Sequence, residues 1–265
     1  MVDQAFDNAR YSRKSSHTDA MEQNVSNRCP SAVSSRLVRR LAAATTMGFG
    51  GDRKQLPLRF APQRATTSEV AEVNMNVFAI RHGETLWSLT GQHTGTTDIP
   101  LTDNGRRLAE RMRPVLTKNA FELVLCSPMQ RARETCELAG LSDKAAVDSD
   151  LMEWNYGEYE GLTPEHIHKI VPGWLIFRDG CPGGETPEQV GMRMDRVIAR
   201  CRAVGGDVAL FAHGHVLRVL AARWIGLPPG GGEHFLLDTG TLSVLGYYRD
   251  VPAVRIWNGP FIEPN

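Results

Sequence analysis

The chain has 265 residues, of which 42% are hydrophobic and 23% charged, and its 30 Lys/Arg balance its 30 Asp/Glu. These values are typical of a globular domain with a sizeable core, and a net charge of zero leaves no basic surplus for binding nucleic acid. No apolar stretch is long enough to span a bilayer. From the charge balance and the lack of such a stretch, we expect neither a nucleic acid nor a membrane as a partner. The five cysteines have no CxxC spacing, which favours reduced thiols over a disulfide framework or a thiolate zinc site.

The first 74 residues differ in composition from the rest of the chain. They carry more Lys/Arg than Asp/Glu, are rich in Ser, Thr, Ala and Arg, and lack sustained apolar periodicity. We therefore predict a disordered extension over 1–74 and a folded domain over 75–265, with Met75 as an alternative start. Residues 34–49 resemble a transit peptide, but acidic residues precede them, and transit peptides are poor in acids. A cytoplasmic location is expected, with organelle targeting as the weaker alternative.

From Met75 onward, short apolar runs alternate with segments of helical periodicity. The internal runs span 77–80, 123–126 and 208–212. Strands that alternate with helices are typical of α/β domains with a parallel sheet. The expected fold is therefore a three-layer α/β/α domain with a mainly parallel sheet. Near the end of the chain, the runs 241–248 and 253–257 are predicted to pair as strands around a turn.

Threonine residues mark the expected starts of three helices. Thr102 precedes a segment with apolar residues at helical spacing, and Thr163 and Thr186 each precede a proline at the first helical position. Gln189 lies three residues after Thr186, which is the spacing of a capping box.

Each internal apolar run ends in residues that carry chemistry. In chain order these are Arg81 and His82, then Ser127 and Arg131, then His213. Because ligands bind beyond the carboxyl ends of strands in open α/β sheets, two arginines and two histidines are expected to converge there. Arginine matches the oxygens of a phosphoryl dianion and stabilises the charge of its transition state. The sequence therefore predicts a site for a small phosphorylated substrate.

A histidine is the expected nucleophile, because the chain has no P-loop, Cys-x5-Arg loop or serine elbow. His82 is the candidate: neighbouring cations disfavour its protonated form, and Gly83 allows a phosphate to approach the backbone. Glu153, flanked by aromatic residues, is expected to protonate the leaving alkoxide and later to deprotonate the attacking water. No cofactor is expected.

Two other features leave alternatives open. His213 and His215 are close in sequence, as in some zinc sites, but alternate residues leaving a strand diverge and no acidic cluster completes a site, so no metal is expected. Arg178 either contacts a second phosphate of the substrate or pairs with the adjacent Asp179.

Four segments resemble the motifs of the histidine phosphatase superfamily, which includes phosphoglycerate mutases and many phosphatases. They are RHGET at 81–85, SPMQRARET at 127–135, LMEWNYGEYEG at 151–161 and FAHGH at 211–215. The resemblance covers residues 76 to about 261, and FRDGCPGGET at 177–186 is similar to the sedoheptulose bisphosphatase branch.

This resemblance implies a phosphoglycerate mutase-like catalytic domain over 75–265. It also implies that His82 is the nucleophile, Arg81 and Arg131 bind the phosphate, His213 is the second histidine and Glu153 is the acid. Further substrate contacts are expected from Gly83, Ser88, Thr94, Gly95, Tyr156, Arg178, Gly214 and His215.

The expected reaction is hydrolysis of small phosphate monoesters, either sugar phosphates or bisphosphates, through a phosphohistidine. A phosphoglycerate mutase-type isomerase is an alternative, although Ser88 replaces the Asn common in such enzymes and the stretch from Glu153 to His213 is short. A catalytically inactive module that binds a phospholigand is a second alternative, which the complete set of five residues disfavours. The sequence gives no indication of oligomeric state.

Overall fold

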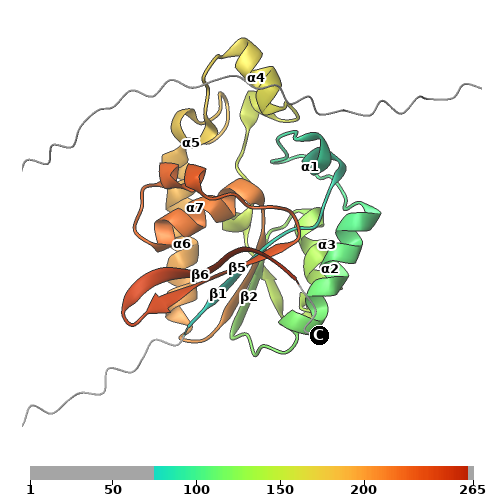
Figure 1. Cartoon of the computed structure of the whole chain (residues 1–265), viewed down its shortest axis with the longest axis vertical. Coiled ribbons are helices and arrows are strands. Elements are labelled where there is room, and N and C mark those ends of the chain that lie inside the picture. Colours follow the sequence, from blue (N-terminus) through green and yellow to red (C-terminus); the bar gives the residue numbers. More distant parts are fainter. Residues whose placement is uncertain (1–74, 262–265) are drawn as a thin grey trace, which may run out of the picture. The chain divides into compact units, whose positions relative to one another are not determined.

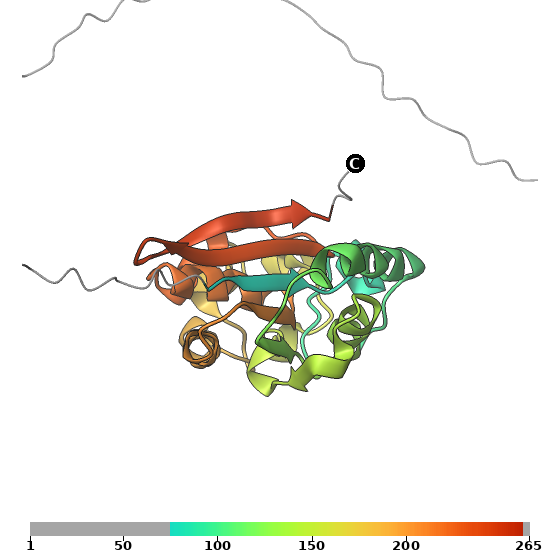
Figure 2. The same cartoon turned by 90° about the horizontal axis from the view of Figure 1, so that it is seen from below.

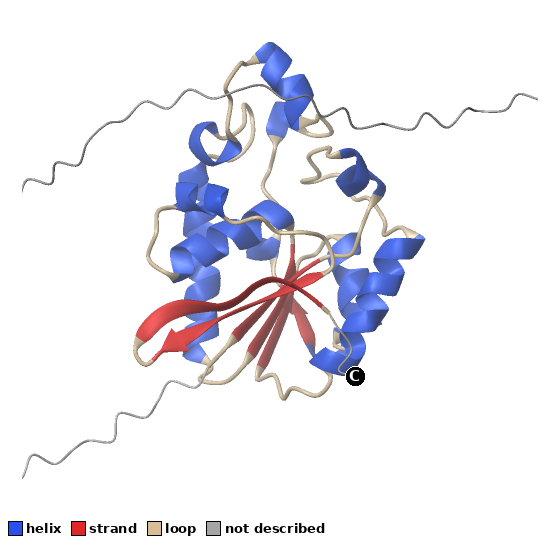
Figure 3. Cartoon of the chain, viewed as in Figure 1, coloured by secondary structure: helices blue, strands red, loops and turns tan. Residues whose placement is uncertain are grey.

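One six-stranded sheet forms the centre of the part of the chain that the computed structural model describes, residues 75–261; the predicted extension over 1–74 lies outside it. The strand order is β3-β2-β4-β1-β5-β6. Figure 3 shows the strands gathered in the middle of the domain, with helices on either side. The strands are β1 (Val77–Arg81), β2 (Leu123–Cys126), β3 (Ala145–Val147), β4 (Val208–Ala212), β5 (Thr241–Tyr248) and β6 (Val251–Pro260). The first four are mutually parallel, and β5 runs antiparallel to both neighbours. The predicted mainly parallel sheet is confirmed.

Helices cover both faces of this sheet, as predicted for a three-layer fold (Figure 2). One face carries α2 (Asp103–Leu116) and α3 (Gln130–Leu138), and the other carries α6 (Pro187–Ala203) and α7 (Gly214–Trp224). Successive strand residues point to opposite faces. Ala79 accordingly packs in the core beneath α6 and α7, whereas Ile80 packs beneath α2 and α3.

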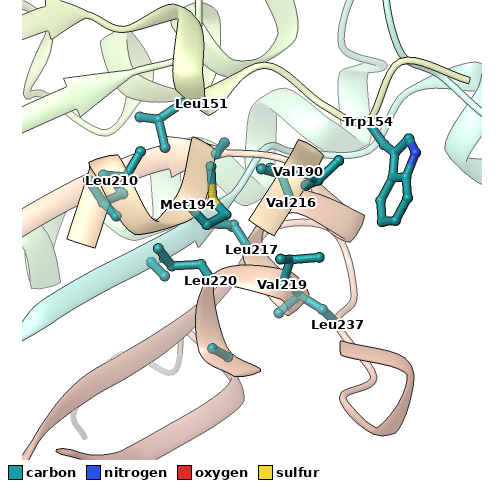
Figure 4. Packing of buried hydrophobic residues seen from close by; sticks show 14 of the residues in the cluster. Leu151, Trp154, Val190, Met194, Leu210, Val216, Leu217, Val219, Leu220 and Leu237 are labelled. Carbon is teal, nitrogen blue, oxygen red and sulfur yellow. The ribbon is translucent and has the colours of Figure 1, made fainter. Parts of the chain in front are cut away.

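The larger core lies between the sheet and the pair α6 and α7 (Figure 4). Val190 and Met194 of α6, Leu210 of β4, and Val216 and Leu220 of α7 are each at most 1% exposed. Burial of one such side chain contributes about 1.5–3 kcal/mol to folding. This packing fixes the start of α7 beside the end of β4.

The threonine caps form where the sequence predicts them. The side chains of Thr102 and Thr163 accept hydrogen bonds from the third residue of α2 and of α4 (Pro164–Ile170) respectively. Thr186 and Gln189 form the complete capping box at the start of α6. Each cap contributes about 1 kcal/mol to its helix.

The predicted C-terminal hairpin is present, with β5 at the expected bounds and β6 longer than expected. Arg249, with a φ of 56°, lies in the turn between the two strands. The register between them shifts near Val244, which bends the ribbon.

Short helices lie beyond the carboxyl ends of the parallel strands (Figure 1). They are α1 (Leu86–Thr90), α4 and α5 (Ile176–Asp179). Short 3-10 helices occur at Ser142–Lys144, Ser149–Leu151, Gly157–Tyr159 and Pro229–His234. The first of these comes directly before β3 and so lies at the amino ends of the parallel strands. The other segments lie around the edge of the sheet where the sequence predicts the site.

Candidate active site

The ends of β1, β2 and β4 bring the predicted residues together. Arg81 is paired in register with Ala212, and the amide of His82 donates to the carbonyl of Ala212 at 3.0 Å. On the other side of β4, the amide of Ser127 donates to the carbonyl of Phe211 at 2.9 Å. The residues that follow the three strands therefore lie next to one another at one edge of the sheet.

His82 is held in one tautomer with one ring nitrogen available. Its Nδ1 lies 2.7 Å from the carbonyl oxygen of Gly83, which can only accept, so Nδ1 carries the proton and Nε2 carries the lone pair. The side chain is only 4% exposed. Burial, followed by the charges of Arg131 and Arg81, holds the pKa of His82 well below its ordinary value. The imidazole is therefore neutral at physiological pH.

The loop that carries His82 is pinned by a close backbone contact. The amide of Gly83 donates to Oγ1 of Thr135 at 3.0 Å. A Cβ atom on Gly83 would lie 2.4 Å from the carbonyl oxygen of Gly105 at the start of α2. Glycine at position 83 is thus required by packing within the protein, and its amide does not line the pocket.

His213 is fixed by Arg131 and Ser127. Nε of Arg131 can only donate, and it lies 3.1 Å from Nδ1 of His213; the His213 Nε2 proton therefore points at Oγ of Ser127, 2.7 Å away. The His82 and His213 rings are 5.1 Å apart. Burial, then the charges of Arg131 and His82, lowers the pKa of His213 well below its ordinary value. Both histidines are thus neutral hydrogen-bonding groups.

The two arginines differ in their hydrogen bonding. Arg131 is fully buried, and its terminal nitrogens donate to the carbonyls of Thr94, Gly95 and Thr97 at 2.9–3.0 Å. Arg81 lines the pocket and donates through Nη1 to the carbonyl of Leu237, whereas its buried Nε has no partner among residues 75–261. Arg81 therefore lines the pocket and has one buried donor, Nε, without a partner among residues 75–261.

The carboxylate of Glu153 lies at the N-terminus of α7. It accepts hydrogen bonds from the backbone amides of Trp154, His215 and Val216 at 2.9–3.0 Å. The N-cap residue of α7, His213, makes no side-chain cap, so Glu153 satisfies donors that the start of a helix leaves open. Glu153 and His82 line the same pocket.

This pocket has a volume of about 190 Å³. Most of the predicted site residues line it: Arg81, His82, Ser88, Thr94, Glu153, Tyr156, Gly214 and His215. The hydroxyl of Ser88 is also engaged in a capping box with Thr85 at the start of α1. Nδ1 of His215 lies 2.6 Å from the hydroxyl of Tyr156, which orients both rings.

Five predicted residues do not line the pocket. Arg131 and His213 lie directly behind it, and Gly83 faces α2. The amide of Gly95 donates to the carboxylate of Glu160 at 2.9 Å, so it too supports the loop rather than the cavity. Arg178 is exposed and forms an ion pair of 2.7 Å with Asp179, which is one of the two alternatives that the sequence left open.

Six lining residues were not predicted: Gly91, Gln92, His93, Pro164, Arg218 and Leu237. Two of them, His93 and Arg218, have titratable side chains. His93, in the loop before Thr94, is 6% exposed and stacks on Tyr156 with ring centroids 4.5 Å apart. Burial lowers the pKa of His93 to about 4. Arg218 lies one helical turn after Gly214 in α7 and also lines the pocket. The four-residue spacing from Gly214 was a signal for Arg218, whereas nothing in the local sequence distinguished His93.

Within residues 75–261, no group of three or more His, Cys, Asp or Glu side chains is arranged to hold a metal ion. Nδ1 of His213 faces Arg131 and Nδ1 of His215 faces Tyr156, so these ring nitrogens point to different partners. The same residues contain no helix that is both long and apolar enough to traverse a bilayer.

Comparison with known proteins agrees with the motifs. Residues 77–260 match the model of the histidine phosphatase superfamily, branch 1. An acid phosphatase of Mycobacterium tuberculosis is 39% identical over 69% of this chain and 92% of its own length. The sedoheptulose 1,7-bisphosphatase of Saccharomyces cerevisiae is 34% identical over 70% of this chain and 93% of its own length. The solved structure of the M. tuberculosis open reading frame Rv3214 superposes with a TM-score of 0.68 at 37% identity, over 71% of this chain and 100% of that one.

Proposed function

We propose, given that the chain belongs to the histidine phosphatase superfamily, that it hydrolyses small phosphate monoesters through a phosphohistidine on His82. Membership of this superfamily supports phosphatase activity in general; the ester class, the residue roles and the independence from metal are proposals. These proposals rest on one observation: His82 has a neutral imidazole with a free Nε2, and it lines a pocket together with Arg81 and Glu153.

In the first step, Nε2 of His82 attacks phosphorus and the bond to the ester oxygen breaks. Arg81 would bind the phosphoryl oxygens through its unpartnered Nε, and the backbone at Gly214 would add the favourable field of the α7 N-terminus. Glu153, which takes up one proton from solvent before this step, gives that proton to the departing alkoxide, which leaves as the alcohol.

In the second step, water attacks the phosphorus of the phosphohistidine. Glu153, now a carboxylate, takes the proton of the water, and the P–N bond breaks to return neutral His82 and inorganic phosphate. The same residue thus serves as acid and then as base.

Arg131 would act from behind the pocket. Its Nε bond to Nδ1 of His213 sets the orientation of that ring. To reach the phosphate directly, its terminal nitrogens must exchange the carbonyls of Thr94, Gly95 and Thr97 for phosphoryl oxygens. Two arginine charges supply the electrostatic stabilisation that a metal ion supplies in other phosphatases, so we propose that no metal is needed.

The finer substrate class is a sugar phosphate or bisphosphate, which the similarity to a sedoheptulose 1,7-bisphosphatase supports. A cytoplasmic location stays a prediction.

Trapping of the covalent intermediate tests this proposal. Enzyme mixed with ³²P-labelled substrate and quenched in alkaline denaturant should carry acid-labile phosphate on His82. His82→Ala should lose the label and turnover while its thermal unfolding stays close to that of the unmodified chain. His234→Ala, which changes an exposed histidine that does not line the pocket, should keep both the label and the turnover. Label on a serine or aspartate would refute the mechanism.

The fate of the phosphate separates hydrolysis from the alternatives. A hydrolase releases one inorganic phosphate for each ester consumed, whereas a mutase returns the phosphate in an isomeric product. A chain that binds substrate without label or product would be the inactive module.

A further inference from the structure

A second cavity adjoins the candidate active-site pocket on the side of α4 and α5. It has a volume of about 220 Å³ and shares four lining residues with the pocket: His93, Pro164, His215 and Arg218. Trp174, Ile176 and Phe177 form its apolar wall. Because they share these residues, the two cavities are neighbours; His82 lines only the first, and the aromatic wall lines only the second.

His93 lies between the two cavities with its hydrogen-bonding capacity unused. Nε2 is fully buried and has no hydrogen-bond partner within residues 75–261. The ring is held between Tyr156, at 4.5 Å, and the edge of Trp174, at 5.6 Å. An unpartnered buried polar group costs about 1–3 kcal/mol, so its presence beside a cavity indicates that a ligand supplies the partner. Because burial keeps the pKa of His93 at about 4, the ring offers a neutral hydrogen bond and no charge.

The charges in the second cavity do not suit another phosphate. Its arginine, Arg218, stacks on Phe177 at 4.4 Å and donates to the backbone carbonyls of Gly232 and Glu233. The Glu233 side chain lines the same cavity, so an incoming dianion would face a carboxylate. Arg178 lies outside both cavities and is paired with Asp179. The only arginine with an unpartnered buried nitrogen in residues 75–261 is Arg81, which lines the first cavity with His82.

We propose that the second cavity binds the alcohol part of the substrate and selects an uncharged polyhydroxy alcohol that carries a single phosphate. An apolar face of the alcohol packs on Trp174 and Phe177, and one hydroxyl group bonds to His93. This inference rests on the proposed function and narrows it, because bisphosphates become the poorer substrates.

Matched pairs of esters test the wall. Ethyl phosphate and 2-phenylethyl phosphate have similarly basic leaving groups and differ in the apolar face. Burial of the phenyl group should raise kcat/KM by about 10- to 100-fold. Phe177→Leu should reduce the ratio of kcat/KM for 2-phenylethyl phosphate to that for ethyl phosphate several-fold. Trp174→Ala, once thermal unfolding shows that the variant is folded, should bring this ratio close to one.

A second pair tests His93. Glycerol 3-phosphate and propyl phosphate have the same charge and chain length, and only the former has free hydroxyl groups. The enzyme should prefer glycerol 3-phosphate by about 2- to 10-fold, the range for one neutral hydrogen bond. His93→Phe keeps the stack on Tyr156 and should remove the preference. Tyr248→Phe, at an exposed position of β5 that lines neither cavity, should keep it.

A third pair, fructose 1-phosphate and fructose 1,6-bisphosphate, tests whether a second phosphate on the substrate is disfavoured. The second phosphate should lower kcat/KM at least several-fold. A bisphosphate that is turned over faster, or ratios that the Phe177 and His93 variants leave unchanged, would overturn the inference.

In the same enzyme samples, transfer of ³²P from labelled p-nitrophenyl phosphate to His82 is measured as well. Label together with unaltered ratios means that the subsite is wrong and the mechanism stands. Absence of label means that the proposed function, and the subsite with it, is wrong.

Discussion

Replacement of Glu153 by glutamine separates its proposed chemical role from its structural one. In the folded chain, Oε1 accepts from the amides of Trp154 and Val216, and Oε2 accepts from the amide of His215. Glutamine keeps one oxygen and so can keep the first two bonds. Its amide group would then oppose the His215 N–H, leaving one donor at the start of α7 without a partner.

The structural cost follows from this count. The substitution removes one charge-assisted hydrogen bond and leaves the buried His215 N–H without an acceptor. Together these effects should lower the free energy of unfolding by about 1.5–3 kcal/mol. Domains of this kind are stable by about 5–15 kcal/mol, so Glu153→Gln should remain folded. The chemical cost should depend on the leaving group. With a sugar phosphate, loss of the acid should slow phosphorylation of His82 by about 10²-fold or more.

The assay is a rapid-quench burst with two substrates, ribose 5-phosphate and p-nitrophenyl phosphate. The nitrophenolate leaves without a proton, so its burst rate should be nearly unchanged in Glu153→Gln. Steady-state turnover of p-nitrophenyl phosphate should still fall, because the carboxylate is also assigned to activate water. Urea unfolding of the same samples measures the structural cost.

Glu160→Gln is the matched control. Glu160 also binds backbone amides, those of Gly95 and Thr97, but does not line the pocket. Its replacement should destabilise the fold and affect both substrates equally. If Glu153→Gln also slowed both bursts equally, Glu153 would serve as a cap alone, and Asp238 would be the next carboxylate to test.

Three further predictions concern acidity, metal and the N-terminal segment. The pKa of His93 is about 4 in the folded chain and about 6.5 in an unfolded one, so between these values only the unfolded state binds the proton and stability falls as the pH falls. Urea unfolding measures how far the free energy of unfolding falls between pH 7 and pH 5. This fall should be about 2 kcal/mol smaller for His93→Phe than for the unmodified chain, and an equal fall would contradict the prediction. Exhaustive chelation should leave phosphate release within about a factor of two, whereas loss restored by zinc would indicate a metal enzyme. A chain that begins at Met75 should keep its turnover, and an insoluble or inactive product would show that residues 1–74 belong to the fold.

The fold was predictable because its signals are local. The apolar runs at β1, β2 and β4, and the caps at Thr102 and Thr186, each depend on residues within one turn or one strand of one another. The convergence of His82, Arg131 and His213 followed from one rule about the carboxyl ends of parallel strands. Their catalytic roles stay predictions.

The remaining contacts join residues far apart in the chain. Glu153 caps a helix that begins 61 residues later, and Arg131 binds the carbonyls of a loop more than 30 residues earlier. Such contacts depend on how whole elements pack, and no local pattern encodes them. His93 shows the same limit: only the folded chain reveals that its ring is buried between Tyr156 and Trp174.

The two neighbouring cavities are built from different parts of the architecture. The residues around His82 are anchored to the sheet, whereas Trp174 and Phe177 belong to the segment around α5 that lies apart from it (Figure 1). Substitutions in this segment can therefore remodel the wall while the end of β1, which carries Arg81 and His82, stays in place. A lineage that duplicated such a gene could acquire new preferences among alcohols by drift in one short stretch of chain, while the chemistry at the sheet edge stayed under purifying selection.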